Sequence, residues 1–202
     1  MRLGYEDAVL NLQGPIIDQA AREFEPALAN LRRRFDIAPG AVGLLGGSIG
    51  AAVAQLVLAE SSVEVMAAVL VSPLVRLRSA VEAMSKRFDI SYEWSEPSLA
   101  VAERLDFVAR VADIARERQP AVLLVVGAED DASGFYQPAV ELRDALAARY
   151  ADPARVNLVT VPGMGHALAE EPGMEPAPQT EHAAAVDKLA VDWLRRYLKP
   201  AR

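Results

Sequence analysis

Four short runs rich in apolar residues divide the chain, and each is followed by a segment with a different pattern of apolar and polar residues. The runs span residues 41–46, 65–71, 121–126 and 156–161. Runs of this length are typical of strands, and an uninterrupted one is typical of a strand buried on both faces of a parallel sheet. Alternation of such strands with helices predicts an α/β fold, in which a mostly parallel sheet is flanked by helices and joined by right-handed crossovers.

The segments between the runs carry apolar residues at the spacing of one helix face. The first predicted helix, over residues 15–35, opens on Pro15 and closes on three arginines, which suit the two ends of a helix. Residues 8–12 ahead of it predict a short strand. A helix over 98–118 is expected to begin at Ser98, whose hydroxyl can cap the first turn. Further helices are expected over residues 48–60, 75–88, 137–149 and 184–197, and a loop rich in Glu and Pro over 170–179.

The totals suit one domain over residues 1–202. The net charge of −7 and the pI near 5.0 argue against nucleic acid or an anionic membrane as a partner. The chain contains no cysteine, which excludes disulfides and zinc sites built from sulfur. No stretch reaches the roughly 18 uncharged apolar residues of a membrane span, and the first residues lack the apolar segment of a signal peptide. We therefore expect a cytoplasmic location.

One turn in this pattern carries a candidate nucleophile. The run 41–46 leads into the sequence Gly-Gly-Ser-Ile-Gly, and a helix that opens on small residues follows. A serine on a tight strand-to-helix turn needs neighbours without bulk, and Gly46 and Gly50 provide that room beside Ser48. The backbone N–H of Ile49, directly after the serine, is expected to stabilise the oxyanion of a tetrahedral intermediate.

A serine hydroxyl needs a base to take its proton, and His166 is the better placed of the two histidines. It follows the fourth run in a glycine-flanked loop, whereas His182 lies near the start of the last helix and is expected to be a surface residue. The carboxylate that orients the imidazole would come from Asp130 or Asp131, which follow the third run. Because the carboxyl ends of parallel strands meet at one edge of a sheet, Ser48, His166 and one of these acids should converge.

These motifs, in the order Ser, Asp, His, resemble the α/β-hydrolase superfamily. The elbow around Ser48, the acid loop 127–130 and the histidine loop 163–166 carry the resemblance. In that superfamily the acid commonly stands three residues after the glycine that ends its strand, which favours Asp130 over Asp131. The resemblance implies hydrolysis of an ester, thioester or amide through an acyl-enzyme. It also implies a small-molecule acyl substrate and no cofactor or metal.

The chain departs from the superfamily pattern ahead of the elbow. Members usually place further strands there, one of which leads into a loop that supplies the second oxyanion-hole donor, and only 47 residues precede Ser48. The chain is expected to be either truncated or a minimal variant whose first strand is covered by residues 1–13 or by another subunit. An uncovered strand 41–46 would invite association, so a homo-oligomer formed through this edge is a further expectation.

The segment 74–118 stands where such enzymes insert a lid. Its Met84, Phe88, Tyr92 and Trp94 would either line an apolar acyl pocket or form an ordinary packed cover. The first hypothesis for function is therefore a carboxylesterase-like serine hydrolase. The alternative hypothesis is a catalytically incompetent subunit of the same fold that acts as an interaction module, because the second oxyanion donor and part of the sheet are missing.

Overall fold

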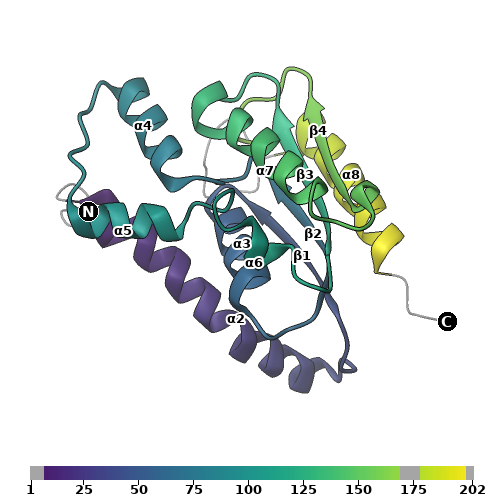
Figure 1. Ribbon diagram of the computed structural model, residues 1–202. Coiled ribbons are helices and arrows are strands. Elements are labelled where there is room, and N and C mark those ends of the chain that lie inside the picture. The colour runs from purple at the N-terminus through teal and green to yellow at the C-terminus, as the bar shows by residue number, and fades with distance from the viewer. Residues whose placement is uncertain (1–6, 169–177, 199–202) are drawn as a thin grey trace.

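The computed structural model describes residues 7–168 and 178–198, which form one parallel sheet flanked by helices (Figure 1). Neighbouring strands run parallel throughout. The α/β prediction is confirmed, and each predicted strand agrees with an observed one to within one residue at either end. The strands, in their order across the sheet, are β1 (Val42–Gly47), β2 (Val65–Val71), β3 (Ala121–Gly127) and β4 (Val156–Val161).

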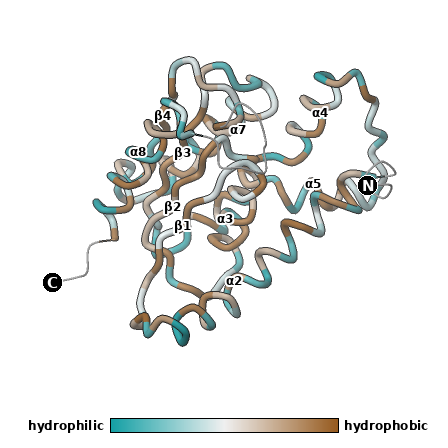
Figure 2. Tube along the Cα trace, turned by 180° about the vertical axis from the view of Figure 1, so that it is seen from behind, coloured by the Kyte–Doolittle hydropathy of each residue, from teal (hydrophilic) through white to brown (hydrophobic). Residues whose placement is uncertain are grey.

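Successive side chains of a strand point to opposite faces of the sheet, so each face has its own core. On one face, side chains such as Leu70 pack among those of α3 (Ile49–Glu60) and α7 (Gln137–Ala147). On the other face, side chains such as Val69 pack against α8 (Glu181–Tyr197). Figure 2 shows the strands as an apolar centre between helices of mixed character. The helices therefore cover the two sheet faces, and α3, with most of its residues buried, lies in the interior on one of them.

A long N-terminal helix packs against α3 from outside. The π-helical turn η1 (Val9–Gln13) runs directly into α2 (Gly14–Phe35), so the predicted helix is confirmed to within one residue. The strand predicted immediately before it is wrong. Asp7 closes a helical turn there, because its carboxylate accepts the N–H of Leu10 at 2.8 Å and its carbonyl accepts that of Asn11 at 2.9 Å. No helix in the described part of the chain is long and apolar enough to cross a bilayer.

The segment between β2 and β3 is helical but more broken than expected. The prediction of a single helix over 98–118 is wrong. After α5 the chain turns back, and its backbone pairs with residues at the start of α4 and just before it. The N–H of Phe107 donates to the Val75 carbonyl at 3.0 Å, and the N–H of Leu77 donates to the Leu105 carbonyl at 3.2 Å. The three helices of this segment are α4 (Leu77–Phe88), α5 (Glu96–Arg104) and α6 (Val111–Ile114).

The start of α5 also differs from the prediction. The capping residue is Ser95, whose hydroxyl accepts the Ser98 N–H at 3.3 Å, while the Ser98 hydroxyl accepts the Ser95 N–H at 2.9 Å. Ser98 is therefore the third residue of the helix, and Pro97 lies in the first turn, where its missing N–H costs nothing. Reciprocal capping of this kind fixes the first turn of the helix at both ends of the motif.

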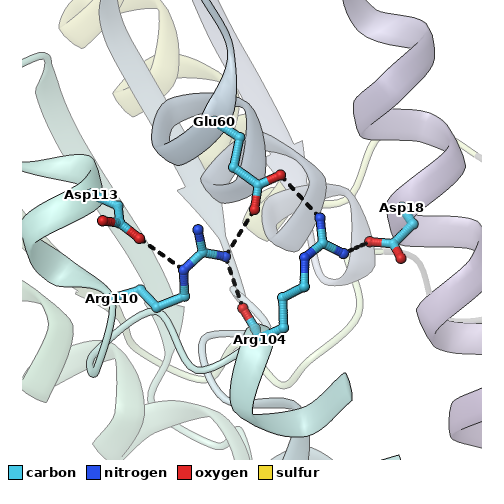
Figure 3. Close-up of polar contacts among 5 residues, drawn as sticks. All are labelled: Asp18, Glu60, Arg104, Arg110 and Asp113. Carbon is cyan, nitrogen blue, oxygen red and sulfur yellow. Dashed lines mark hydrogen bonds and ion pairs between the residues drawn. The ribbon is translucent and has the colours of Figure 1, made fainter. Parts of the chain in front are cut away.

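Five charged side chains connect the N-terminal helix and the α4–α6 segment to α3 (Figure 3). Arg104 at the end of α5 pairs with Asp18 of α2 and with Glu60 of α3. Arg110, just before α6, pairs with the second oxygen of Glu60 at 3.0 Å and with Asp113 at 2.9 Å. An isolated surface pair contributes only about 0–1 kcal/mol. Here the pairs share partners, so they hold four helical elements in one arrangement.

Strand β1 forms an edge of the sheet. Within the described ranges, no strand pairs with the side of β1 that faces away from β2. The strand contains no charged residue and no proline, and its Leu45 side chain is 60% exposed. Natural edge strands usually carry charges, prolines or bulges that prevent pairing with another chain. Of these, β1 has one irregularity, a register shift between Val42 and Gly43 in its pairing with β2. The expected association through this edge thus remains a prediction with a defined surface.

We expect Leu45→Lys to weaken self-association, because a charge on an edge strand opposes pairing with a second strand. Sedimentation velocity over a range of protein concentrations measures the effect. Ile90→Lys is the matched control, since Ile90 is equally exposed, at 62%, and lies after α4, outside the sheet. A wild-type chain that stays monomeric at every concentration contradicts the prediction, as does a Leu45→Lys chain that associates unchanged.

Candidate active site

Ser48 occupies the turn between the end of β1 and the start of α3. Its backbone has φ 49° and ψ −115°, a conformation that costs on the order of 1–3 kcal/mol for a residue with a side chain. Backbone hydrogen bonds on both sides hold it there. The Ser48 N–H donates to the Val71 carbonyl at 2.9 Å. The Ser48 carbonyl accepts the N–H of Ala51 at 3.0 Å and those of Ala52 and Leu74 at 3.3 Å. A serine fixed in a strained strand-to-helix turn is the arrangement of a nucleophile elbow.

The two glycines that flank the serine have different roles. A Cβ on Gly46 would lie 2.3 Å from the Gly50 carbonyl oxygen, so the first turn of α3 can approach β1 only if this residue is glycine. A Cβ on Gly50 would meet nothing within 4 Å. The expectation that both glycines are needed for room is therefore met by Gly46 and not by Gly50.

The structure brings Ser48, His166 and Asp130 together in one chain of hydrogen bonds. His166 Nδ1 lies 2.9 Å from Asp130 Oδ2 and 3.2 Å from Oδ1, and His166 Nε2 lies 2.9 Å from Ser48 Oγ. The Asp130 side chain is only 2% exposed, and that of His166 is 30% exposed. An ionised carboxylate can only accept hydrogen bonds, so Nδ1 carries the proton and Nε2 is free to accept the Ser48 hydroxyl.

Backbone contacts between two loops place the acid beside the imidazole. Gly127 ends β3, and a Cβ there would lie 2.1 Å from the carbonyl oxygen of Met164 in the histidine loop. The N–H of Ala128 donates to the Val161 carbonyl at 3.0 Å, and the N–H of Glu129 donates to that of Met164 at 2.9 Å. The glycine thus permits the close approach that aligns the loop after β3 with the loop after β4.

Asp131, the other candidate acid, has a separate structural task. It caps the turn η2 (Ala132–Tyr136), because its carboxylate accepts the N–H of Gly134 at 2.7 Å and the N–H of Ser133 at 3.0 Å. These hydrogen bonds, with that from the Gly134 N–H the strongest, hold the pKa of Asp131 below its ordinary value. The geometry therefore separates the two acids, with Asp130 beside the imidazole and Asp131 at a helix start.

A groove of about 710 Å³ opens beside Ser48 and His166. Met84, Phe88, Tyr92 and Trp94, expected either to line an apolar pocket or to form a packed cover, do not line it. Tyr92 and Trp94 pack against the core, whereas Met84 and Phe88 are exposed. Sequence reasoning missed the true walls of the groove, because the apolar stripe of α8 reads as ordinary core. The remaining lining residues are Leu45, Gly47, Val71, Ser72, Ala167, Leu168, Ala183, Val186, Asp187 and Ala190.

An oxyanion formed at Ser48 would lie next to the N-terminus of α3. Ile49 is the first residue of α3, and the first N–H groups of a helix have no acceptor inside it. Its N–H is therefore available next to Ser48, and its role at the oxyanion remains a prediction. None of residues 7–41 lines the groove, so a second backbone donor from that part of the chain is not found there.

His182, expected to be a surface residue, is half-buried near Gly163 rather than fully exposed.

Solved structures with the same fold include several hydrolases. An esterase from Pyrococcus furiosus shares 16% identity and a TM-score of 0.57, over 89% of this chain and 62% of the esterase. An acylaminoacyl peptidase from Pyrococcus horikoshii shares 14% identity and a TM-score of 0.63, over 87% of this chain and 27% of the peptidase. A monoacylglycerol lipase from Paleococcus ferrophilus shares 15% identity and a TM-score of 0.56, over 88% of this chain and 74% of the lipase.

These likenesses confirm the α/β-hydrolase fold expected from the sequence. The chain spans less than two thirds of the length of the esterase and of the peptidase. No curated protein matches it. The sequence profile of the prolyl oligopeptidase family matches residues 17–200, well over half of the 202 residues. The chain therefore belongs to the prolyl oligopeptidase family.

Proposed function

We propose that the chain is a serine hydrolase that cleaves a carboxylic ester of a small molecule through an acyl-enzyme on Ser48. The observation that carries this proposal is the hydrogen-bonded chain from Asp130 through His166 to Ser48, with both joining distances at 2.9 Å. A serine activated by an oriented imidazole is the common requirement of acyl-transfer enzymes.

In the first step, Ser48 Oγ attacks the acyl carbon while its proton passes to His166 Nε2. Asp130 stabilises the imidazolium through Nδ1–H, and the Ile49 N–H stabilises the oxyanion. His166 then gives its proton to the leaving alkoxide as the carbon–oxygen bond breaks. In the second step, water loses a proton to His166 and attacks the acyl carbon. The bond between that carbon and Ser48 Oγ then breaks, and His166 returns the proton to Ser48 Oγ as the carboxylic acid leaves.

The walls of the groove favour an apolar acyl group. Leu45, Val71, Leu168 and Val186 present hydrocarbon next to Ser48, and apolar surface removed from water contributes roughly 25 cal/mol per Å² to binding. Fold neighbours act on esters or on peptides, by their names. These walls suit an apolar acyl chain better than a charged peptide, so we propose an ester as the substrate.

We also propose a cytoplasmic location, as expected from the sequence.

A fluorophosphonate probe tests the proposal directly. We expect it to label the wild-type chain once, with the added mass on Ser48, and p-nitrophenyl butyrate turnover to fall in parallel with labelling. A peptide p-nitroanilide measured alongside distinguishes esterase from peptidase action. A folded chain that neither labels nor hydrolyses the ester would instead favour the interaction module, because an incomplete oxyanion hole leaves a triad without turnover.

A further inference from the structure

An aromatic ring covers one face of the His166 imidazole. The ring centroids of Phe135 and His166 are 4.1 Å apart, and the two planes are inclined by 46°. Phe135 is itself buried, at 7% exposure. The contact therefore closes one side of an imidazole whose other surroundings include the open groove.

The turn that carries Phe135 is anchored at its start. Asp131 accepts the N–H groups of Ser133 and Gly134 and the hydroxyl of Ser133, the last at 2.9 Å. The Asp131 carbonyl also accepts the N–H of Phe135 at 3.1 Å. Asp131, the residue directly after the triad acid, therefore fixes the start of the turn that positions the Phe135 ring.

Helix α4 supports the turn from the opposite side. A Cβ on Gly134 would lie 2.6 Å from the Cβ of Ala83 and 3.5 Å from the Ser79 carbonyl oxygen. The backbone of Gly134 and the surface of α4 are therefore in close contact. The turn that carries Phe135 is therefore fixed against α4 at the residue directly before the phenyl ring.

The two hydrogen bonds of His166 do not by themselves fix the orientation of its ring. The imidazole can rotate about its Cβ–Cγ bond, and such a rotation moves Nδ1 and Nε2 out of their present plane, away from Asp130 and from Ser48 Oγ. A hydrogen bond tolerates moderate misalignment before it weakens steeply. A side chain packed against the ring limits that rotation, and Phe135 is in contact with it.

We propose that Phe135 is a positioning residue that holds the His166 imidazole in the plane required for proton transfer, through the turn that Asp131 caps and α4 supports. The inference rests on the proposed function, because it assigns Phe135 a part in the same reaction. A phenyl ring also favours the imidazolium that forms in the transition state, since its face is electronegative.

Steady-state kinetics of Phe135→Leu test this proposal. We expect kcat to fall by about tenfold to a hundredfold, the scale of a small misplacement of a reacting group, while KM changes little. Phe135→Tyr keeps the ring and should retain most of the wild-type kcat. Phe107→Leu is the matched control, because Phe107 is fully buried away from the groove and its loss lowers stability without touching His166.

A second readout does not depend on turnover. In a His182→Gln background His166 is the one remaining histidine, so its Nδ1–H proton can be assigned by NMR. We expect Phe135→Leu to broaden or weaken this resonance and Phe107→Leu to leave it unchanged. Should Phe135→Leu not fold, Gly134→Ala displaces the same turn against Ala83, and Ala83→Gly added to it should restore kcat.

An unchanged kcat in folded Phe135→Leu overturns the inference, and so does a lower kcat with an unchanged Nδ1–H resonance. Failure of the proposed function has a different signature. In that case Ser48 is not labelled and its substitution leaves turnover intact, while the imidazole resonance still reports on the contact between the rings.

Discussion

Ser48→Ala is expected to abolish ester turnover, with a fall in kcat of about 10⁴-fold or more. The reason is that the variant has no oxygen to form the acyl-enzyme. The hydrogen bond that it loses is the one between Ser48 Oγ and His166 Nε2. The strained backbone at this position is the same for Ala as for Ser. The variant should therefore fold, and binding of a non-hydrolysable ester analogue should persist when measured by calorimetry.

Ser62→Ala is the control for the loss of a serine hydroxyl. Ser62 hydrogen bonds to Glu25 beyond the far end of α3, outside the groove. We expect it to keep wild-type kcat and to be labelled by the fluorophosphonate as the wild type is. Residual turnover in Ser48→Ala above about 1% of wild type would mean that another group is the nucleophile.

Asp130→Asn is expected to lower kcat on the order of 10³- to 10⁴-fold. An amide can donate its N–H to Nδ1, which selects the tautomer that carries its proton on Nε2 and cannot accept the Ser48 hydroxyl. It also leaves the imidazolium without its carboxylate, in a position where that carboxylate is 2% exposed. The pH dependence of kcat/KM together with thermal melting would separate this chemical effect from a loss of fold.

Asp131→Asn is the matched control, because it removes an acid one residue away. The amide oxygen can still accept the N–H groups of Ser133 and Gly134, so the cap of η2 is kept. We expect kcat to change by less than about tenfold, the change arising through Phe135 alone. If Asp131→Asn were the more damaging of the two, the assignment of the triad acid would be reversed.

Strands and long helices could be predicted here because local pattern and tertiary position agree. Val65–Val71 is apolar throughout and lies inside the sheet with both faces covered. The prediction of one helix over 98–118 is wrong because there the local pattern and the tertiary position disagree. Leu105 and Phe107 lie inside the predicted helix, yet both are buried where the backbone pairs back to Val75 and Leu77, and that pairing is not visible in the local sequence.

The positions of the site residues could be predicted for a similar reason. Ser48, Asp130 and His166 each follow the end of a strand, and parallel strands bring their ends to one edge whatever the loops do. The walls of the groove could not be predicted. Val186 and Ala190 line the groove because of the way α8 packs on the sheet. Phe135 contacts the imidazole because Asp131 and α4 determine the shape of its turn.

The charged residues that link α2, α3, α5 and α6 constrain which substitutions this sequence can accept during evolution. Glu60 accepts from Arg104 and Arg110 through different oxygens, and Arg110 also donates to the Arg104 carbonyl. Loss of Glu60 alone would leave two neighbouring guanidinium groups with only Asp18 and Asp113 as carboxylate partners among the described residues, so that exchange is better tolerated once one of the arginines has changed. Among descendants of this chain, these positions should covary as a set, with acids and arginines disappearing together.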